Sequence, residues 1–429
     1  MMVQTHYPHR SNLQFRLNFF MAMKTDIIIS HQIETSFRTQ LLLCISLLMK
    51  ALLFLFISFA LSNCTSRDSL VAPPTLDSIS VTVGGGFGSG RYKVGDTIFV
   101  WSNPPAINQV FDTWSGDANM LNDKNEWRAF FVASTANVSL MAKYKSFPAF
   151  TFIAEMINGS EVFYYVPTNY RGIIIPFHGK GGAAQSWVNK QEENSNFTRY
   201  AVANGYAVVI TESVDRINRQ WQISTNSVDV NNIDAILSHL ANRGIISLSK
   251  PIYGVGMSQG GNFCSAISYQ KNYKAASIYC IPGRDAVFTL SNVPTLWNMA
   301  QNDITEEPTR LVNAQTNFSV LRSRGVVASY AVNPPTPLYP ERFTIISGID
   351  VAGSTSIFRA LQANGYINAK GYLTIDVHTN AIWRSVIPMA YQTSTYLNSI
   401  EDQLTVCYAQ HNFYKDANYR TIAFFNQFP

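Results

Sequence analysis

Ser258 is the residue of this chain whose neighbours in the sequence best suit chemistry. It is the centre of Gly256-Met257-Ser258-Gln259-Gly260, a G-x-S-x-G pattern between an apolar run, 252–255, and a helix-compatible segment, 262–269. A serine on a tight strand-to-helix turn has strained backbone angles, and side chains two positions away on either side would collide with neighbouring backbone. The helix N-terminus beneath it favours negative charge that develops nearby. The stretch therefore predicts a nucleophilic serine, and an ordinary strand-to-helix turn is the alternative.

The segments around this serine alternate between buried strands and helices. Continuous apolar runs predict strands at 171–177, 206–210, 252–257 and 276–281, and helical spacing predicts helices at 186–204 and 229–243. Two further runs flank Asn158-Gly159, which is a hairpin signal. Strands that alternate with helices indicate βαβ units, so we predict the α/β class, with a mainly parallel sheet and helices on both faces.

Residues 150–429 resemble the α/β-hydrolase superfamily. The resemblance rests on the turn His178-Gly179-Lys180-Gly181-Gly182, on the pattern around Ser258, and on their order along the chain. Within the superfamily, the general character of the sequence is most similar to that of secreted esterases of the polyhydroxybutyrate-depolymerase and feruloyl-esterase kind. The resemblance implies a serine esterase whose oxyanion hole uses the backbone N–H groups of Lys180 and Gln259, while His178 is structural.

A nucleophilic serine needs a base, and in this superfamily the order is serine, acid, histidine. Only two histidines follow Ser258. We expect His411 to be the base, because a closing amphipathic segment, 416–428, follows it as a last helix does in the superfamily. His378, which follows a possible strand end, is the alternative.

The acid is expected at the end of the strand after the one that contains Cys280. Asp303 closes a polar turn after the apolar run 293–300, and a predicted helix, 311–324, and strand, 326–332, follow it. We therefore expect Asp303 to orient the histidine. Asp350 ends a similar run, 344–349, and is the alternative acid.

If Asp303 and His411 act together, residues 333–410 form an insertion between the last strand and the histidine. Helix-like stretches occur in it at 356–362 and 391–410. Such an insertion is predicted to form a lid or cap over the site. Its aromatic residues either line a pocket for an acyl or phenolic group or pack the cap; they include Phe343, Tyr366 and Trp383.

Residues 75–145 have a different pattern of apolar and polar residues. Alternating runs at 76–83, 96–101 and 138–144 predict half-buried antiparallel strands, and the glycine-rich stretch 84–90 predicts a hairpin turn. The order of Gly90–Asp96, Phe111–Gly116 and Ala142–Tyr144 resembles the internalin-type B-repeat modules of bacterial surface proteins. That resemblance implies a spacer or adhesive module, in which Trp101 and Trp114 are expected to pack the core rather than bind sugar.

The N-terminal segment predicts export. Lys50, an apolar run and a small-residue boundary form a secretory signal over 49–63, which suggests that translation begins at Met49 and that 1–48 is an over-long start. Leu61-Ser62-Asn63-Cys64 resembles a bacterial lipoprotein box, which implies lipid on Cys64, a surface or periplasmic location, and a linker over 64–74. A membrane helix over 41–61 is the alternative, but Lys50 lies near its middle, where a charge is costly.

Composition sets further bounds. The 429 residues are 47% hydrophobic and 14% charged, which indicates a globular protein with room for two domains. The net charge is +5, of which five basic and two acidic residues before Cys64 supply +3, so no basic stripe indicates nucleic-acid binding. Cys264, Cys280 and Cys407 are too widely spaced for a disulfide framework or a metal site, and no cofactor is expected.

These patterns together predict a secreted or surface-anchored serine hydrolase. It would cleave carboxylic esters through an acyl-enzyme, with acyl or feruloyl groups on polysaccharide, or a short polyester, as substrates. A serine peptidase of the same fold is one alternative, and a catalytically inactive glycan-binding surface protein is another. The sequence does not predict an oligomeric state.

Overall fold

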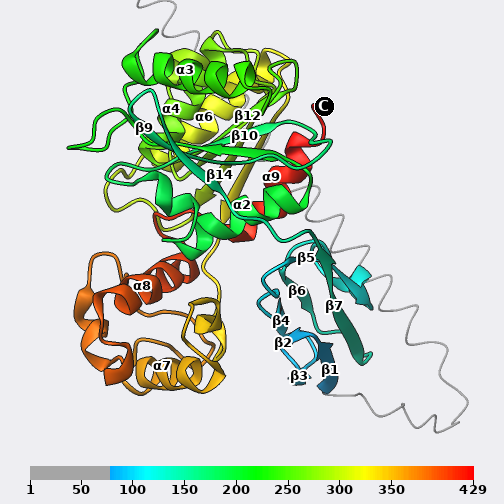
Figure 1. The fold of residues 1–429 in the computed structure, drawn as a ribbon. Helices are drawn as coiled ribbons and strands as arrows, with labels where there is room; N and C mark the ends of the chain where they lie inside the picture. The colour runs from blue at the N-terminus through cyan, green and yellow to red at the C-terminus, as the bar shows by residue number, and fades with distance from the viewer. Residues whose placement is uncertain (1–77) are drawn as a thin grey trace, which may run out of the picture. The chain divides into compact units, whose positions relative to one another are not determined.

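The computed structural model of the protein describes residues 78–429 (Figure 1). The expected signal, the linker and Cys64 lie outside the described residues. Across residues 78–429 no helix combines the length and the apolar character needed to cross a bilayer.

An eight-stranded sheet organises residues 153–333. Its strands are β8 (Ile153–Ile157), β9 (Ser160–Tyr165), β10 (Ile173–Phe177), β11 (Ala207–Ile210), β12 (Ile252–Met257), β13 (Ala275–Tyr279), β14 (Thr295–Ala300) and β15 (Ala328–Asn333). The spatial order is β15-β14-β13-β12-β10-β11-β9-β8, and β9 runs antiparallel to both of its neighbours, whereas the other pairs are parallel. This mainly parallel sheet has the α/β-hydrolase arrangement, so the predicted fold class is confirmed.

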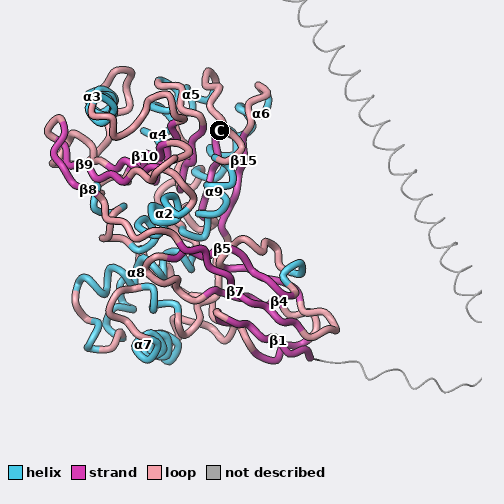
Figure 2. The backbone as a smooth tube through the Cα atoms, turned by 45° about the vertical axis from the view of Figure 1, so that its right-hand side comes forward, coloured by secondary structure: helices cyan, strands magenta, loops and turns pink. Residues whose placement is uncertain are grey.

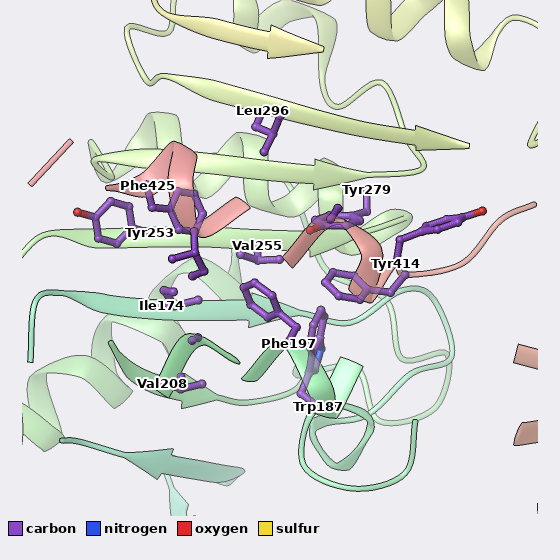
Figure 3. Close-up of a cluster of buried hydrophobic side chains, with 14 of the residues drawn as sticks. Ile174, Trp187, Phe197, Val208, Tyr253, Val255, Tyr279, Leu296, Tyr414 and Phe425 are labelled. Atoms are coloured by element: carbon purple, nitrogen blue, oxygen red, sulfur yellow. The ribbon is translucent and has the colours of Figure 1, made fainter. Parts of the chain in front are cut away.

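Helices cover both faces of this sheet, as Figure 1 shows. One face carries α3 (Val228–Asn242), α4 (Gln259–Gln270) and α6 (Arg310–Ser323), with the short α5 (Asp285–Phe288), and the other carries α2 (Glu192–Ala203) and α9 (Asn418–Phe425). Successive residues of a strand point to opposite faces, so Ile173 and Ile175 join one core and Ile174 the other. Figure 3 shows Ile174, Phe197 and Phe425 in that second core. Burial on both faces explains why β10 is a continuous apolar run.

Residues 334–410 form helices and loops rather than a continuation of the sheet (Figure 2). They contain α7 (Val351–Ala363), α8 (Ser394–Tyr408) and three short 3-10 helices, η3 (Arg342–Ile345), η4 (Ala381–Val386) and η5 (Met389–Tyr391). These elements have a hydrophobic core of their own. Phe343 and Trp383 are fully buried in it and Tyr366 packs against it, so these aromatic residues pack the insertion.

Residues 78–146 form two small sheets of orders β3-β1-β7-β5 and β2-β4-β6. Their strands are β1 (Ser78–Gly84), β2 (Gly86–Phe87), β3 (Gly90–Lys93), β4 (Thr97–Ser102), β5 (Gln109–Gly116), β6 (Arg128–Val132) and β7 (Val138–Ser146), with the 3-10 helix η1 (Ala118–Met120). Both Trp101 and Trp114 are buried. Four of the five strand pairs in these two sheets are antiparallel, as predicted, and the exception is that β1 and β7 pair in parallel. No tight turn joins these two strands, so no hairpin fixes their relative direction.

Candidate active site

Ser258 lies on a strained turn between β12 and α4. Its backbone has φ 55° and ψ −128°, a conformation that residues other than glycine rarely adopt. A Cβ atom on Gly256 would lie 2.2 Å from the carbonyl oxygen of Gly260, and one on Gly260 would lie 2.4 Å from that of His178. The N–H of Ser258 donates to the carbonyl of Tyr279 at 2.9 Å. The turn therefore requires both glycines, and a neighbouring strand holds it in place.

The His178–Gly182 segment forms a second tight turn beside this serine. The N–H of Gly182 donates to the carbonyl of Gly179 at 3.0 Å, and Gly181 has φ 76°, which favours glycine. The Lys180 side chain is exposed. Within the part of the chain that the structure describes, the backbone N–H groups of Lys180 and Gln259 have no hydrogen-bond acceptor. Two free donors of this kind can stabilise an anionic oxygen.

Trp221 links the two turns. Its indole Nε1 donates to the carbonyl of His178 at 2.9 Å, and its backbone N–H donates to Oε1 of Gln259 at 3.0 Å. The ring also stacks on Phe263 of α4, with centroids 4.6 Å apart. One residue thus fixes the His178 turn against the first residue of α4.

His178 is part of this support. The residue is 1% exposed, and its Nε2 accepts a hydrogen bond from the N–H of Ser213 at 3.1 Å. Burial lowers the pKa of His178 to about 4, so the ring is neutral at ordinary pH and available as an acceptor.

The structure brings Asp303 and His411 together. The Nδ1 atom of His411 lies 2.8 Å from Oδ2 of Asp303, and their side chains are 16% and 2% exposed. A proton on Nδ1 donates to the carboxylate and leaves Nε2 as an acceptor. That is the arrangement in which a histidine can remove a proton from a hydroxyl group.

The two alternative residues have other surroundings. Asp350 caps α7, where its Oδ1 accepts from the N–H of Gly353 at 2.7 Å. Nε2 of His378 lies 3.9 Å from Oε1 of Glu306. Within residues 78–429, neither Asp350 nor His378 is hydrogen-bonded to Asp303 or His411.

Arg310 is a third member of this cluster that sequence reasoning did not identify. Its side chain is 6% exposed, its guanidinium donates to Asp303, and its Nη1 lies 2.9 Å from Nδ1 of His411. A guanidinium can only donate, so it cannot accept a proton from Nδ1; in the tautomer whose Nδ1 donates to Oδ2 of Asp303, Arg310 binds the other carboxylate oxygen. A signal was present in the sequence, because Arg310 begins α6, where the helix dipole disfavours a cation that has no anionic partner.

Cys280 also contacts the cluster, although the sequence indicated only a buried core position in a strand. It follows β13 with φ 54°, and its Sγ donates to the carbonyl of Asn412, the residue after His411, at 3.2 Å. Burial, and secondarily the Asp303 carboxylate, raises the pKa of the thiol well above its ordinary value, so it is protonated.

Possible metal-ligand atoms of Cys280, Asp303 and His411 lie within 4.8 Å of one another. The guanidinium of Arg310 already pairs with this carboxylate, and a second cation here would be repelled by it. This charge arrangement favours a proton-transfer cluster over a metal site.

The serine and the histidine line one cavity of about 970 Å³. The same cavity is lined by Lys180 and His378, by Asn194 of α2, and by residues of α8 in the insertion. A substrate in this cavity would contact both the sheet domain and the insertion.

Comparisons with family models and with curated proteins find no match for this chain. Solved structures with a similar fold include a predicted CIB-like hydrolase from Thermoplasma acidophilum (15% identity, 43% of this chain and 87% of that chain, TM-score 0.32). Another is the Pyrococcus furiosus esterase Pf2001 (11% identity, 43% of this chain and 82% of that chain, TM-score 0.34). A third is a dienelactone hydrolase from Anabaena variabilis (13% identity, 44% of this chain and 87% of that chain, TM-score 0.33). At this level of similarity the comparison says nothing about the substrate.

Proposed function

We propose that the protein is a serine hydrolase that cleaves carboxylic esters through an acyl-enzyme. The observation that carries the proposal is the hydrogen bond between His411 and the buried Asp303 beside a cavity that Ser258 also lines. Nε2 of His411 removes the proton of the Ser258 hydroxyl, and Asp303 holds the imidazole in the required tautomer. The serine oxygen attacks the ester carbonyl, His411 returns the proton to the leaving alcohol, and water then releases the acyl group.

The developing negative charge needs stabilisation during this attack. The backbone N–H groups of Lys180 and Gln259 are the proposed donors, since both lack another acceptor among the described residues. One donor of this kind contributes about 3–4 kcal/mol to transition-state stabilisation. Helix α4 begins directly after Ser258, so its N-terminus adds to the favourable field.

Hydrolysis of p-nitrophenyl acetate by the purified protein tests this proposal. The Ser258→Ala variant should lose activity by about a million-fold, to near background. Ser319→Ala, which changes an exposed serine of α6, is the matched control and should retain full activity. Equal rates for wild type and Ser258→Ala would refute the role of this serine.

Two further measurements separate the ester hydrolase from its alternatives. A peptidase of the same fold would cleave casein faster than a panel of simple esters. An inactive glycan-binding protein would not react with a fluorophosphonate probe and would be retained on a glycan array. We expect labelling of Ser258 by the probe and a preference for esters, because no feature of the described cavity is specific to a peptide backbone.

We also propose that the enzyme acts outside the cell, attached through Cys64 or secreted, with residues 75–145 as a spacer or adhesive module. The motivation is the signal-like segment before Cys64 and the B-repeat-like sequence order. Labelling of the full chain with an alkyne-tagged palmitate in a Gram-negative host tests the anchor. Label should be absent from the Cys64→Ser variant, and equal labelling of both proteins would exclude lipid at this residue.

A further inference from the structure

Residues 78–146, which we call the β module, pack against the rest of the described chain. Residues 78–429 belong to one compact unit. Trp101 of β4 stacks on Tyr339 of the insertion with ring centroids 4.4 Å apart, and each of the two residues is 7% exposed. The β module therefore has a buried contact face, which a spacer or adhesive role does not require.

A second contact of the β module reaches the segment that follows the histidine. Asp416 lies five residues after His411, in the 3-10 helix η6 (Lys415–Ala417), and is 5% exposed. Nε1 of Trp127 donates to its Oδ1 at 2.8 Å, and Nε of Arg128 donates to its Oδ2 at 3.0 Å. Burial disfavours the charged form of Asp416, but Arg128 and the other nearby cations outweigh burial and lower its pKa, so the group is a carboxylate. Both oxygens of this carboxylate are thus bound by consecutive residues of the β module.

The ring of Trp127 also joins this segment to the insertion. Nζ of Lys415 lies 4.1 Å from the ring centroid, and the guanidinium carbon of Arg342 in η3 lies 5.4 Å from it. Both distances are within cation–π range. The backbone N–H of Lys415 donates to Oε2 of Glu193 in α2 at 2.8 Å. One side chain of the β module therefore contacts both the insertion that precedes the histidine and the segment that follows it.

The loop that carries the histidine, residues 411–414, has neither helix nor strand geometry. Phe413 and Tyr414 are each 1% exposed and pack in a core of the sheet, which holds this loop against the sheet. Catalysis needs a finer placement of the imidazole, because a misplacement of about 1 Å can cost about a hundredfold in rate. Asp416 is the charged anchor on the C-terminal side of the loop.

We propose that Trp127 and Arg128 are positioning residues, which fix the His411 loop through Asp416 and make the β module part of the catalytic unit. The inference rests on the proposed esterase function and adds residues that set its rate. Within residues 78–429, neither side chain lines the active-site cavity or bonds to the serine, the acid or the histidine, so their effect on catalysis is indirect.

Kinetics of two variants with p-nitrophenyl acetate test the inference. Arg128→Gln leaves the Asp416 carboxylate without this cation and should lower kcat by about ten- to a hundredfold. Trp127→Phe keeps an aromatic ring but removes the Nε1 donor, and it should lower kcat by about three- to tenfold. KM should change by less than about twofold in both variants, because neither residue lines the cavity that holds the substrate.

Two variants inside the β module are the matched controls. Arg91→Gln removes a guanidinium that donates to Oγ of Ser78 at 3.2 Å, and Tyr92→Phe removes a hydroxyl that donates to the carbonyl of Gly88 at 2.9 Å. Neither bond reaches the histidine loop, so kcat and KM should stay within about twofold of wild type. Melting curves establish that every variant is folded at the assay temperature, so that a lower kcat does not report unfolding.

A double-mutant cycle assigns the effect to the contact with Asp416. Asp416→Asn should lower kcat by about as much as Arg128→Gln, and the double variant should lose no more than about the larger of the two single losses. Losses that multiply in the double variant would show that Arg128 affects catalysis by another route, which overturns the proposed positioning.

The remaining outcomes separate the inference from the esterase proposal. An unchanged kcat in both Trp127→Phe and Arg128→Gln would overturn the positioning role while the esterase proposal stands. A loss of the same size in Tyr92→Phe would attribute the effect to general destabilisation of the β module and would overturn the role as well. Wild-type protein that does not hydrolyse p-nitrophenyl acetate would overturn the esterase proposal and the inference with it.

Discussion

Nδ1 of His411 lies 2.8 Å from Oδ2 of Asp303, although 108 residues separate them in the sequence. The chain between them returns close to where it left the sheet, because the N–H of Thr336 donates to the carbonyl of Cys407 at 2.9 Å. Asn302, which precedes the acid, donates through its backbone N–H to Ala409 and through Nδ2 to Tyr408. These bonds tie the end of the insertion to the loop of the acid and hold the histidine beside it.

The first prediction concerns the acid. Asp303→Asn should lower kcat for p-nitrophenyl acetate by about ten-thousand-fold, because an amide stabilises the wrong histidine tautomer. Asp350→Asn is the matched control, since it changes only the cap of α7 and asparagine caps helices about as well as aspartate. Steady-state kinetics on both proteins measure the difference. A large loss in the Asp350 variant alone would make Asp350 the acid.

The base gives the second prediction. His411→Ala should abolish hydrolysis to about the level of Ser258→Ala, because the two residues act as a unit. His378→Ala removes a partly exposed ring that lies 3.9 Å from Glu306, and it should change kcat by less than about threefold. Activity that survives in the His411 variant but not in the His378 variant would reverse the assignment.

The sequence was most informative where local backbone geometry determines residue type. The glycines around Ser258 and the apolar run of β10 are requirements of a tight turn and of a doubly covered strand, and both can be read without a structure. The predicted helix at 311–324 and the strand at 326–332 correspond to α6 and β15 within a few residues.

Features that depend on distant contacts could not be predicted in this way. The parallel pairing of β1 with β7 joins segments from opposite ends of a module, and the choice between Asp303 and Asp350 depended on where a long insertion returns. Arg310 and Cys280 lie near the acid only after β13 and β14 align; the sequence pattern indicated no role for Arg310 and only a buried core position for Cys280.

Arg310 provides the third prediction, as a positioning residue. Arg310→Met should lower kcat by about ten- to a hundredfold with little change in KM, because Asp303 loses the partner that fixes its second oxygen. Unfolding free energy should also fall by about 3–5 kcal/mol, since a buried carboxylate is left without its cation. Arg310→Lys should restore part of both quantities. An unchanged kcat in a destabilised Arg310→Met protein would show that the residue is only structural.

The fourth prediction concerns the turn that presents Ser258. Gly256→Ala should lower the free energy of unfolding by about 2–4 kcal/mol and abolish activity, because its Cβ would lie 2.2 Å from a backbone oxygen that cannot move aside. Gly244→Ala is the control, since its Cβ would meet no atom within 4 Å and only the positive φ of 71° costs about 1 kcal/mol. Urea unfolding and p-nitrophenyl acetate hydrolysis measure both effects. A Gly256 variant as active as the Gly244 variant would contradict the prediction.

The fifth prediction is a pH dependence of stability that arises from His178. Burial lowers its pKa to about 4, below its ordinary value of 6.5, so the unfolded chain binds a proton in this window that the folded protein does not. Stability should therefore decline as the pH falls from 6.5 to 4, by about 3 kcal/mol from this residue. His178→Asn keeps an acceptor for the N–H of Ser213 but does not titrate, so its urea-unfolding free energy should fall less steeply over the same range. If the unfolding free energies of wild type and His178→Asn decline equally over this pH range, His178 is not the group that causes the decline.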